Sequence, residues 1–156
     1  MLKFVSYDIV FQEIPDEVTL AVNISGCPNG CLGCHSPHLQ QDIGHPLTSE
    51  ALDLLLREYE GAITCFCFMG GDGSPEDVAL LANWLREHYP QLKTAWYSGR
   101  TKIPEEMDVR LFDYLKLGPY LERDGGLRSR TTNQRLYHVS VGSNGVHMKD
   151  ITTRFW

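Results

Sequence analysis

Cys27, Cys31 and Cys34 lie within eight residues of one another, and their spacing follows the pattern C-x3-C-x2-C. Cysteine thiolates are the usual protein ligands of iron–sulfur clusters. Three thiolates from one loop can bind three irons of a cubane, which leaves the fourth iron without a protein ligand. The amino and carboxylate groups of a small molecule can then bind this open iron. The spacing therefore predicts a 4Fe–4S cluster with Cys27, Cys31 and Cys34 as its ligands.

A structural zinc site is the alternative use of these thiolates, with His35 or His38 as a fourth ligand. Structural zinc sites usually combine one close pair of ligands with a second, distant pair, and no second pair with that spacing is present. Cys65 and Cys67 are separated by one residue on an expected strand, so their side chains share one face. They approach the cysteine loop only if that face is the interior of a barrel, and we expect them to be small buried core residues.

Strands and helices alternate along the chain after the first expected strand. Runs rich in β-branched and aromatic residues predict strands over residues 18–24, 62–69, 92–97 and 114–117. Thr48 or Ser49 is expected to begin one helix, and Ser74 followed by Pro75 a second one. Weaker patterns predict an edge strand over 4–11, a short helix over 104–108, and a hairpin of strands 137–141 and 146–151.

This alternation of strands and helices is typical of βα units, whose strands form a parallel sheet. A complete eight-unit barrel needs about 250 residues, whereas the sequence has 156. We therefore expect one α/β domain over residues 1–156, built as a partial, open (βα) barrel with parallel strands. An open barrel of this kind leaves a lateral mouth.

The composition argues against two classes of partner. Lys and Arg total 14 against 20 for Asp and Glu, so the formal net charge is −6. An acidic protein repels nucleic-acid phosphates unless its cations cluster, and the densest basic stretch, residues 123–135, is better explained as a solvated loop. No apolar run is long enough for a membrane span, and no signal-peptide core is present. We expect neither nucleic acid nor membrane as a partner, and a cytoplasmic location.

A glycine-rich segment, Gly70-Gly71-Asp72-Gly73, follows the expected strand 62–69 and precedes the second helix. A turn between a strand and a helix can bind a phosphate. The segment lacks the glycine patterns of phosphate-binding loops and dinucleotide-binding folds. A tight turn is therefore its ordinary explanation when the segment is taken alone.

The cysteine spacing directly after a strand resembles the signature of the radical S-adenosylmethionine (SAM) superfamily. The resemblance implies that SAM binds the open iron, and that reduction of the cluster cleaves SAM to methionine and a 5′-deoxyadenosyl radical. Gly70, Gly71 and Asp72 then resemble the Gly-Gly-Glu motif that binds the SAM ammonium group, and a Cβ at Gly71 is expected to fill space needed by the methionine moiety. Lys116 falls near the SAM contacts of related activases. The expected cofactor site also includes Gly33, Cys34 and His35.

Among the members of this superfamily, the chain resembles the activating proteins of anaerobic (class III) ribonucleoside-triphosphate reductase. The shared stretches are residues 26–37, 96–99, 117–120 and 125–135. The resemblance implies a glycyl radical formed on the reductase large subunit, and a low-potential electron donor such as flavodoxin. It also implies that the polar segment 123–135 borders the mouth and receives the glycine-bearing loop. No side chain is assigned as a general base.

Two other functions agree with the same residues. The chain is alternatively an activase of a different glycyl-radical enzyme or a radical SAM enzyme that acts on a small molecule. Outside catalysis, the alternative is a zinc-binding interaction module. Iron content distinguishes the radical enzymes from the zinc module.

Overall fold

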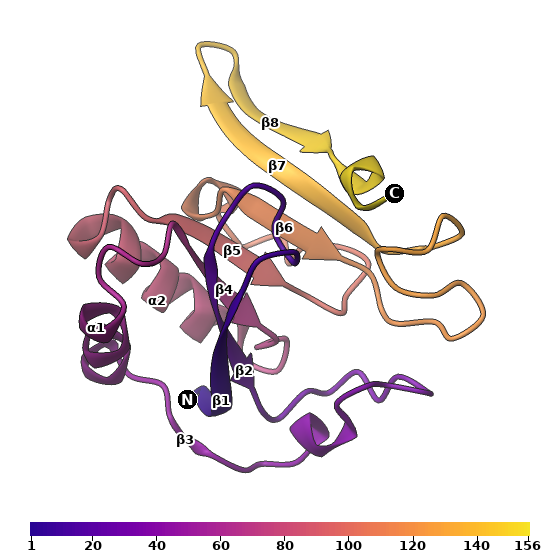
Figure 1. Ribbon diagram of the computed structural model, residues 1–156, viewed down its shortest axis with the longest axis horizontal. Coiled ribbons are helices and arrows are strands. Elements are labelled where there is room, and N and C mark those ends of the chain that lie inside the picture. The colour runs from indigo at the N-terminus through magenta and orange to yellow at the C-terminus, as the bar shows by residue number, and fades with distance from the viewer.

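The computed structural model describes residues 1–156 and contains one eight-stranded sheet with the order β3-β1-β2-β4-β5-β6-β7-β8 (Figure 1). Its four central strands are parallel: β2 (Thr19–Ile24), β4 (Cys65–Met69), β5 (Lys93–Tyr97) and β6 (Tyr114–Leu117). These are the four strands that the sequence predicts, each trimmed by no more than three residues. The fold is a mixed α/β open sheet with a parallel centre, as expected for a partial barrel.

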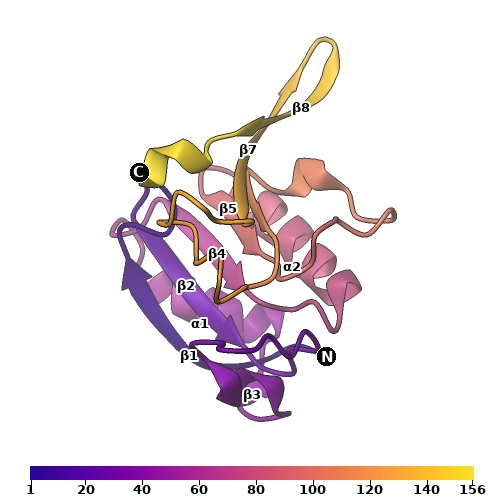
Figure 2. The same ribbon diagram turned by 90° about the vertical axis from the view of Figure 1, so that its right-hand side faces the viewer.

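Antiparallel strands extend this parallel centre on both sides (Figure 2). On one side β1 (Lys3–Val10) pairs with β2, and β3 (His45–Pro46) pairs with β1. On the other side β7 (Arg135–Gly142) pairs with β6 and forms the predicted hairpin with β8 (Gly145–Asp150). Strands joined without a crossover helix pair in the antiparallel sense, and the sequence patterns did not predict that the hairpin would join the sheet.

Both long helices cover the same face of the sheet (Figure 1). Helix α1 (Ser49–Glu58) begins after Thr48, whose hydroxyl accepts a hydrogen bond from the Ala51 amide at 3.1 Å. Helix α2 (Pro75–His88) begins after Ser74, but the Ser74 hydroxyl donates to Asp77 Oδ2 at 2.7 Å instead of capping a backbone amide. None of the helices is long and apolar enough to cross a bilayer.

Three short 3-10 helices complete the structure: η1 (Pro37–Gln40), η2 (Val109–Leu111) and η3 (Thr152–Phe155). The helix predicted over residues 104–108 is wrong, because that stretch forms turns and the helical turn follows it as η2. Pro104 favours the start of a helix, but the Asp108 carboxylate accepts a hydrogen bond from the Arg110 amide and begins the helical turn there, at 3.0 Å.

The larger of two apolar cores fills the space between the sheet and the helices. It contains 19 buried residues. Phe66 and Phe68 of β4 point into it and meet edge to face at 4.8 Å, and Trp96 of β5 stacks on Phe112 at 5.6 Å. Alternate residues of each central strand therefore hold α1 and α2 against the sheet.

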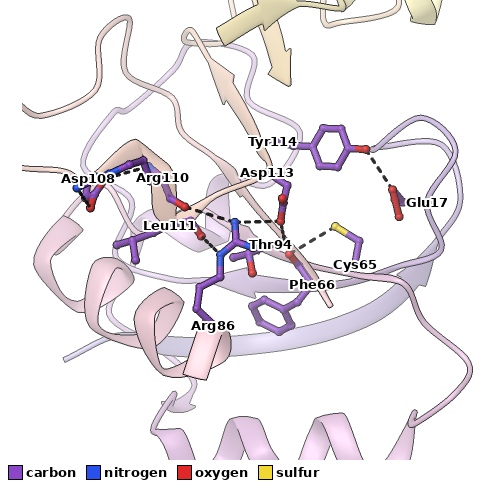
Figure 3. Close-up of polar contacts among 10 residues, drawn as sticks. All are labelled: Glu17, Cys65, Phe66, Arg86, Thr94, Asp108, Arg110, Leu111, Asp113 and Tyr114. Atoms are coloured by element: carbon purple, nitrogen blue, oxygen red, sulfur yellow. Dashed lines mark hydrogen bonds and ion pairs between the residues drawn. The ribbon is translucent and has the colours of Figure 1, made fainter. Parts of the chain in front are cut away.

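An ion pair between α2 and the residue before β6 holds the start of β6 (Figure 3). Arg86 of α2 lies 3.1 Å from Asp113 Oδ2 and donates to the Leu111 carbonyl at 3.1 Å. The same Asp113 oxygen accepts a hydrogen bond from the Thr94 amide at 2.9 Å. Asp113 thus ties β6 to both α2 and β5, which fixes the position of the residues further along β6.

The face opposite the helices carries a second, smaller core. Ile14, from the segment between β1 and β2, is fully buried there against Cys65 and Cys67. The segment is held by Glu17, whose carboxylate accepts a hydrogen bond from the Tyr114 hydroxyl at 3.1 Å (Figure 3). This face is therefore covered over the starts and middles of the strands. Burial raises the pKa of both cysteine thiols.

The burial of these two thiols gives a testable prediction. Changing Cys67 to serine places a hydroxyl in an apolar core, which we expect to lower the free energy of unfolding by about 1–3 kcal/mol. Iron content should stay at the wild-type level, because Cys67 lies in the core and not in the cysteine loop. Urea denaturation and iron analysis measure the two effects, with Cys67→Ala as the control for size. Loss of iron from folded Cys67→Ser protein would mean that this thiol is a ligand.

Candidate metal centre

The cysteine loop begins after β2 and ends before α1, and two backbone hydrogen bonds join its ends. The Gly26 amide donates to the Gln41 carbonyl at 3.0 Å, and the Cys27 amide donates to the Leu39 carbonyl at 2.8 Å. Between these anchor points the thiols of Cys27, Cys31 and Cys34 are partly buried and not joined in disulfides. The chain therefore carries three free thiols on one loop whose ends are anchored by hydrogen bonds.

Two N–H groups of the chain point at these sulfurs. Asn29 Nδ2 lies 3.4 Å from Cys27 Sγ, and the Ser36 amide lies 3.4 Å from Cys34 Sγ. Hydrogen bonds to sulfur are typical of iron–sulfur sites. The donor set and its surroundings therefore fit an iron–sulfur cluster.

The zinc alternative receives no support from the arrangement of side chains. No three His, Cys, Asp or Glu side chains come close enough to bind a single metal ion. A structural zinc site needs four ligands around one ion, whereas the thiolates of a cubane bind separate irons and stand farther apart. His35 instead contacts the ring of Tyr120, with ring centroids 4.8 Å apart.

The glycine turn lies directly against the base of the cysteine loop. A Cβ at Gly73 would stand 3.1 Å from the Gly26 carbonyl oxygen. Gly70 and Gly71 both have positive φ, at 113° and 99°, which favours glycine. Their carbonyls already have partners: Trp96 Nε1 donates to Gly70 O at 2.8 Å, and the Ser74 amide donates to Gly71 O at 3.0 Å. The structure thus brings together the two motifs that the sequence singled out.

The structure shows where a side chain at Gly71 would point. A Cβ built on Gly71 points away from the cysteine loop, into the core beneath α2, where it would lie 2.6 Å from Val78 Cγ2. The sequence places Gly71 correctly at the end of β4 but does not show in which direction a side chain at this position would point. A larger residue at this position would therefore overlap the core.

Asp72 is buried at 8% exposure and lies at the centre of a hydrogen-bond network. Its Oδ1 accepts from the Ser98 hydroxyl at 2.5 Å. Its Oδ2 accepts from the Gly99 amide at 2.8 Å and from Asn29 Nδ2 at 2.7 Å. Sequence reasoning gave no role to Asn29, Ser98 or Gly99, although all three lie in stretches that carry the family resemblance.

Lys116, at the end of β6, is buried. Its side chain is 8% exposed, and Nζ donates to the carbonyls of Ser98 at 3.1 Å and Gly118 at 2.9 Å. Burial lowers the pKa of Lys116 to about 8, and the nearby charges of Asp72 and Cys31 partly oppose this shift. The carboxyl ends of the parallel strands therefore hold a buried cation and a buried carboxylate close to the cysteine loop.

The segment after β6 uses part of its polar side chains internally. Asn133 Nδ2 donates to the Pro119 carbonyl at 2.9 Å, and the Thr132 hydroxyl donates to the Gly125 carbonyl at 3.1 Å. Arg128 pairs with Gln12, whereas Arg130 is exposed. Of the expected docking donors, Asn133 therefore serves the fold of the segment itself.

A groove of about 450 Å³ separates the cysteine loop from this segment. Its walls are Asn29, Cys31 and Leu32 on one side and residues 119–123 on the other. Gly33 lies against the side chain of Glu122, because a Cβ at Gly33 would stand 3.1 Å from Glu122 Oε2. Of the expected cofactor residues, Gly33, Cys34 and His35 therefore lie on the loop that borders this groove.

The buried lysine gives a prediction about pH. In the cluster-free protein Lys116 titrates at about pH 8, whereas an unfolded lysine titrates near 10.5. Between these values the unfolded chain binds one more proton, so stability should rise with pH. We expect the free energy of unfolding of the wild type to gain about 3 kcal/mol relative to Lys116→Met between these two pH values. Urea denaturation of both proteins measures this difference, and an unchanged difference across the range would contradict the burial of a titrating amine.

Comparison with known proteins agrees with the geometry. A family model described as a 4Fe-4S single cluster domain matches residues 17–116, which include the cysteine loop, the glycine turn and Lys116. A search of curated proteins gives no significant match, and a search of solved structures gives none either. The match covers well over half of the 156 residues. The chain belongs to the family of 4Fe-4S single cluster domains, which is typical of radical SAM activases.

Proposed function

We propose that this protein binds a 4Fe–4S cluster through Cys27, Cys31 and Cys34, and uses SAM to generate a glycyl radical on anaerobic ribonucleoside-triphosphate reductase. The observation that carries the proposal is the position of the cysteine loop. It lies against the glycine turn and the ends of β4, β5 and β6, beside the buried Lys116 and Asp72. Family membership supports the activase class. The reductase as partner is supported by the stretches 26–37, 96–99, 117–120 and 125–135.

The residues of the chain have separate tasks in this proposal. When bound, the cluster and SAM would supply the electron transfer and the radical that removes a hydrogen atom from the glycine. The Lys116 ammonium has three N–H groups, two of which are used by Ser98 and Gly118. The third is free to bind an anionic group such as the SAM carboxylate. Gly70 and Gly71 form the turn that ends β4 at the same edge, because both have positive φ.

A glycine inside another protein must reach this site from outside. The groove between the cysteine loop and residues 119–123 opens beside Cys31, so an extended backbone segment laid along it would pass close to the cluster. In this proposal the exposed Arg130 contacts that partner. Holding the reacting groups in position and away from water is the main contribution of the protein to such a reaction.

The decisive experiment uses the anaerobically reconstituted protein, SAM, a low-potential reductant such as reduced flavodoxin, and the reductase. We expect a glycyl radical in the EPR spectrum of the reductase, together with 5′-deoxyadenosine. Deoxyadenosine without a glycyl radical would indicate a different radical SAM substrate and would reject the reductase as partner. A complete cluster that does not cleave SAM would reject the proposed activity.

A further inference from the structure

We propose that Asp72 is a positioning residue that acts through Asn29, whose side-chain amide it holds in hydrogen-bond contact with Cys27. This inference rests on the proposed role of Cys27 as a cluster ligand. It assigns to Asp72 a task other than contact with a bound ammonium group. Three independent features of the structure lead to it.

The first feature is the saturation of the Asp72 carboxylate. An ionised carboxylate offers about four lone-pair positions, and three donors from two remote parts of the chain fill three of them: Asn29, Ser98 and Gly99. The side chain is 8% exposed. Asp72 therefore joins the cysteine loop to the end of β5, and little of its hydrogen-bonding capacity remains for a ligand.

The second feature is the orientation of the Asn29 amide. Its Nδ2 atom lies 2.7 Å from Asp72 Oδ2 and 3.4 Å from Cys27 Sγ. The amide nitrogen carries two hydrogens, so one can bind the carboxylate while the other points at the sulfur. Because a carboxylate accepts and never donates, Asp72 also fixes which end of the amide faces Cys27.

The third feature is Gly99, whose lack of a side chain makes room for this amide. A Cβ built on Gly99 would lie 2.5 Å from Asn29 Nδ2 and 3.4 Å from Asp72 Oδ2. Gly99 does not have a positive φ angle, so its backbone conformation also allows other residues. Glycine at position 99 therefore leaves the space that the Asn29 amide occupies.

A hydrogen bond to a ligand sulfur changes the redox properties of an iron–sulfur cluster. It stabilises the more negative, reduced state and raises the reduction potential. The network of Asp72, Asn29 and Gly99 thus sets how readily the cluster accepts an electron. Removal of the Asn29 amide should make reduction harder without removing any ligand.

The test measures the midpoint potential by EPR-monitored redox titration, together with iron content and thermal unfolding. Asn29→Ala and Gly99→Ala should retain iron but show a more negative potential. At a fixed ambient potential the reduced-to-oxidised ratio should fall about tenfold, which corresponds to about 59 mV for one electron. Gly142→Ala is the matched control, because a Cβ at Gly142 has no neighbour within 4 Å.

Two substitutions of Asp72 separate its charge from its geometry. Asp72→Asn can still accept from Asn29 and Gly99 through its oxygen, and its amide can donate to the Ser98 hydroxyl. Asp72→Ala is equally uncharged but cannot hold Asn29. We expect the potential of Asp72→Ala to lie below that of Asp72→Asn by about the shift found for Asn29→Ala.

Two outcomes would overturn the inference. One is a wild-type potential in both Asn29→Ala and Gly99→Ala, and the other is equal potentials in Asp72→Ala and Asp72→Asn. A wild-type protein that assembles no cluster would instead reject the proposed function. The two failures are therefore distinguishable.

Discussion

Replacement of Cys31 by alanine is expected to abolish both the cluster and the radical activity while the protein stays folded. Removing one of three thiolates leaves one iron without a protein anchor, and the remaining two ligands cannot hold a cubane. Cys31 lies on a partly exposed loop outside both apolar cores, so its loss should cost little stability. We expect the same result for Cys27→Ala and Cys34→Ala.

The measurement is iron and sulfide content after anaerobic reconstitution, followed by the visible spectrum and the glycyl-radical assay. Wild-type protein should approach about four irons per chain. Cys65→Ala is the matched control, since it makes the same substitution at a buried cysteine of the small core. A Cys31→Ala protein with full iron content and full activity would remove the basis of the cluster assignment.

Replacement of Gly71 by valine should strongly destabilise the fold. The new Cβ would lie 2.6 Å from Val78 Cγ2, and the backbone has φ +99°. Overpacking of a core typically costs about 1–3 kcal/mol, and the left-handed conformation adds about 1–2 kcal/mol for a residue with a Cβ. Small domains are stable by only about 5–15 kcal/mol, so a large share of the stability would be lost.

Two companion variants separate the causes of this loss, measured by urea denaturation. Gly145→Val introduces the same side chain at φ +103° with no neighbour within 4 Å, so it should show the backbone strain alone. Val78→Ala in the Gly71→Val background removes the overlapping methyl groups and should restore part of the stability. A fully stable Gly71→Val protein that no longer binds SAM would reinstate the role expected from the sequence.

The local patterns of the sequence predict the secondary structure of the parallel centre well. Apolar and β-branched runs define β2, β4, β5 and β6, and Thr48 begins α1 as a capping residue should. The cysteine spacing and the glycine turn identify the site region, because both motifs depend on residues close together in the chain. Predictions of this kind need only neighbouring residues.

The parts of the fold and site that the sequence does not predict depend on contacts between remote residues. Asn29 and Asp72 are 43 positions apart, and Ser98 is 26 positions beyond Asp72. Alternation predicts that Cys65 and Cys67 share a face, but only the placement of the helices shows which face it is. The direction in which a side chain at position 71 would point cannot be predicted from the local sequence for the same reason. No local sequence pattern predicts that Ile14 packs over the sheet.

The cover that Ile14 forms over the sheet has a consequence for folding and local opening. It is held by contacts between distant parts of the chain, such as Tyr114 with Glu17 and Arg154 with Asp16, which are 97 and 138 positions apart. Contacts of such high sequence separation form slowly, and an element held by few of them opens with a low local free energy. The cover should therefore close late in folding and open first. Thiol reagents should then label Cys65 and Cys67 faster than global unfolding allows, which makes these two cysteines natural reporters of the opening.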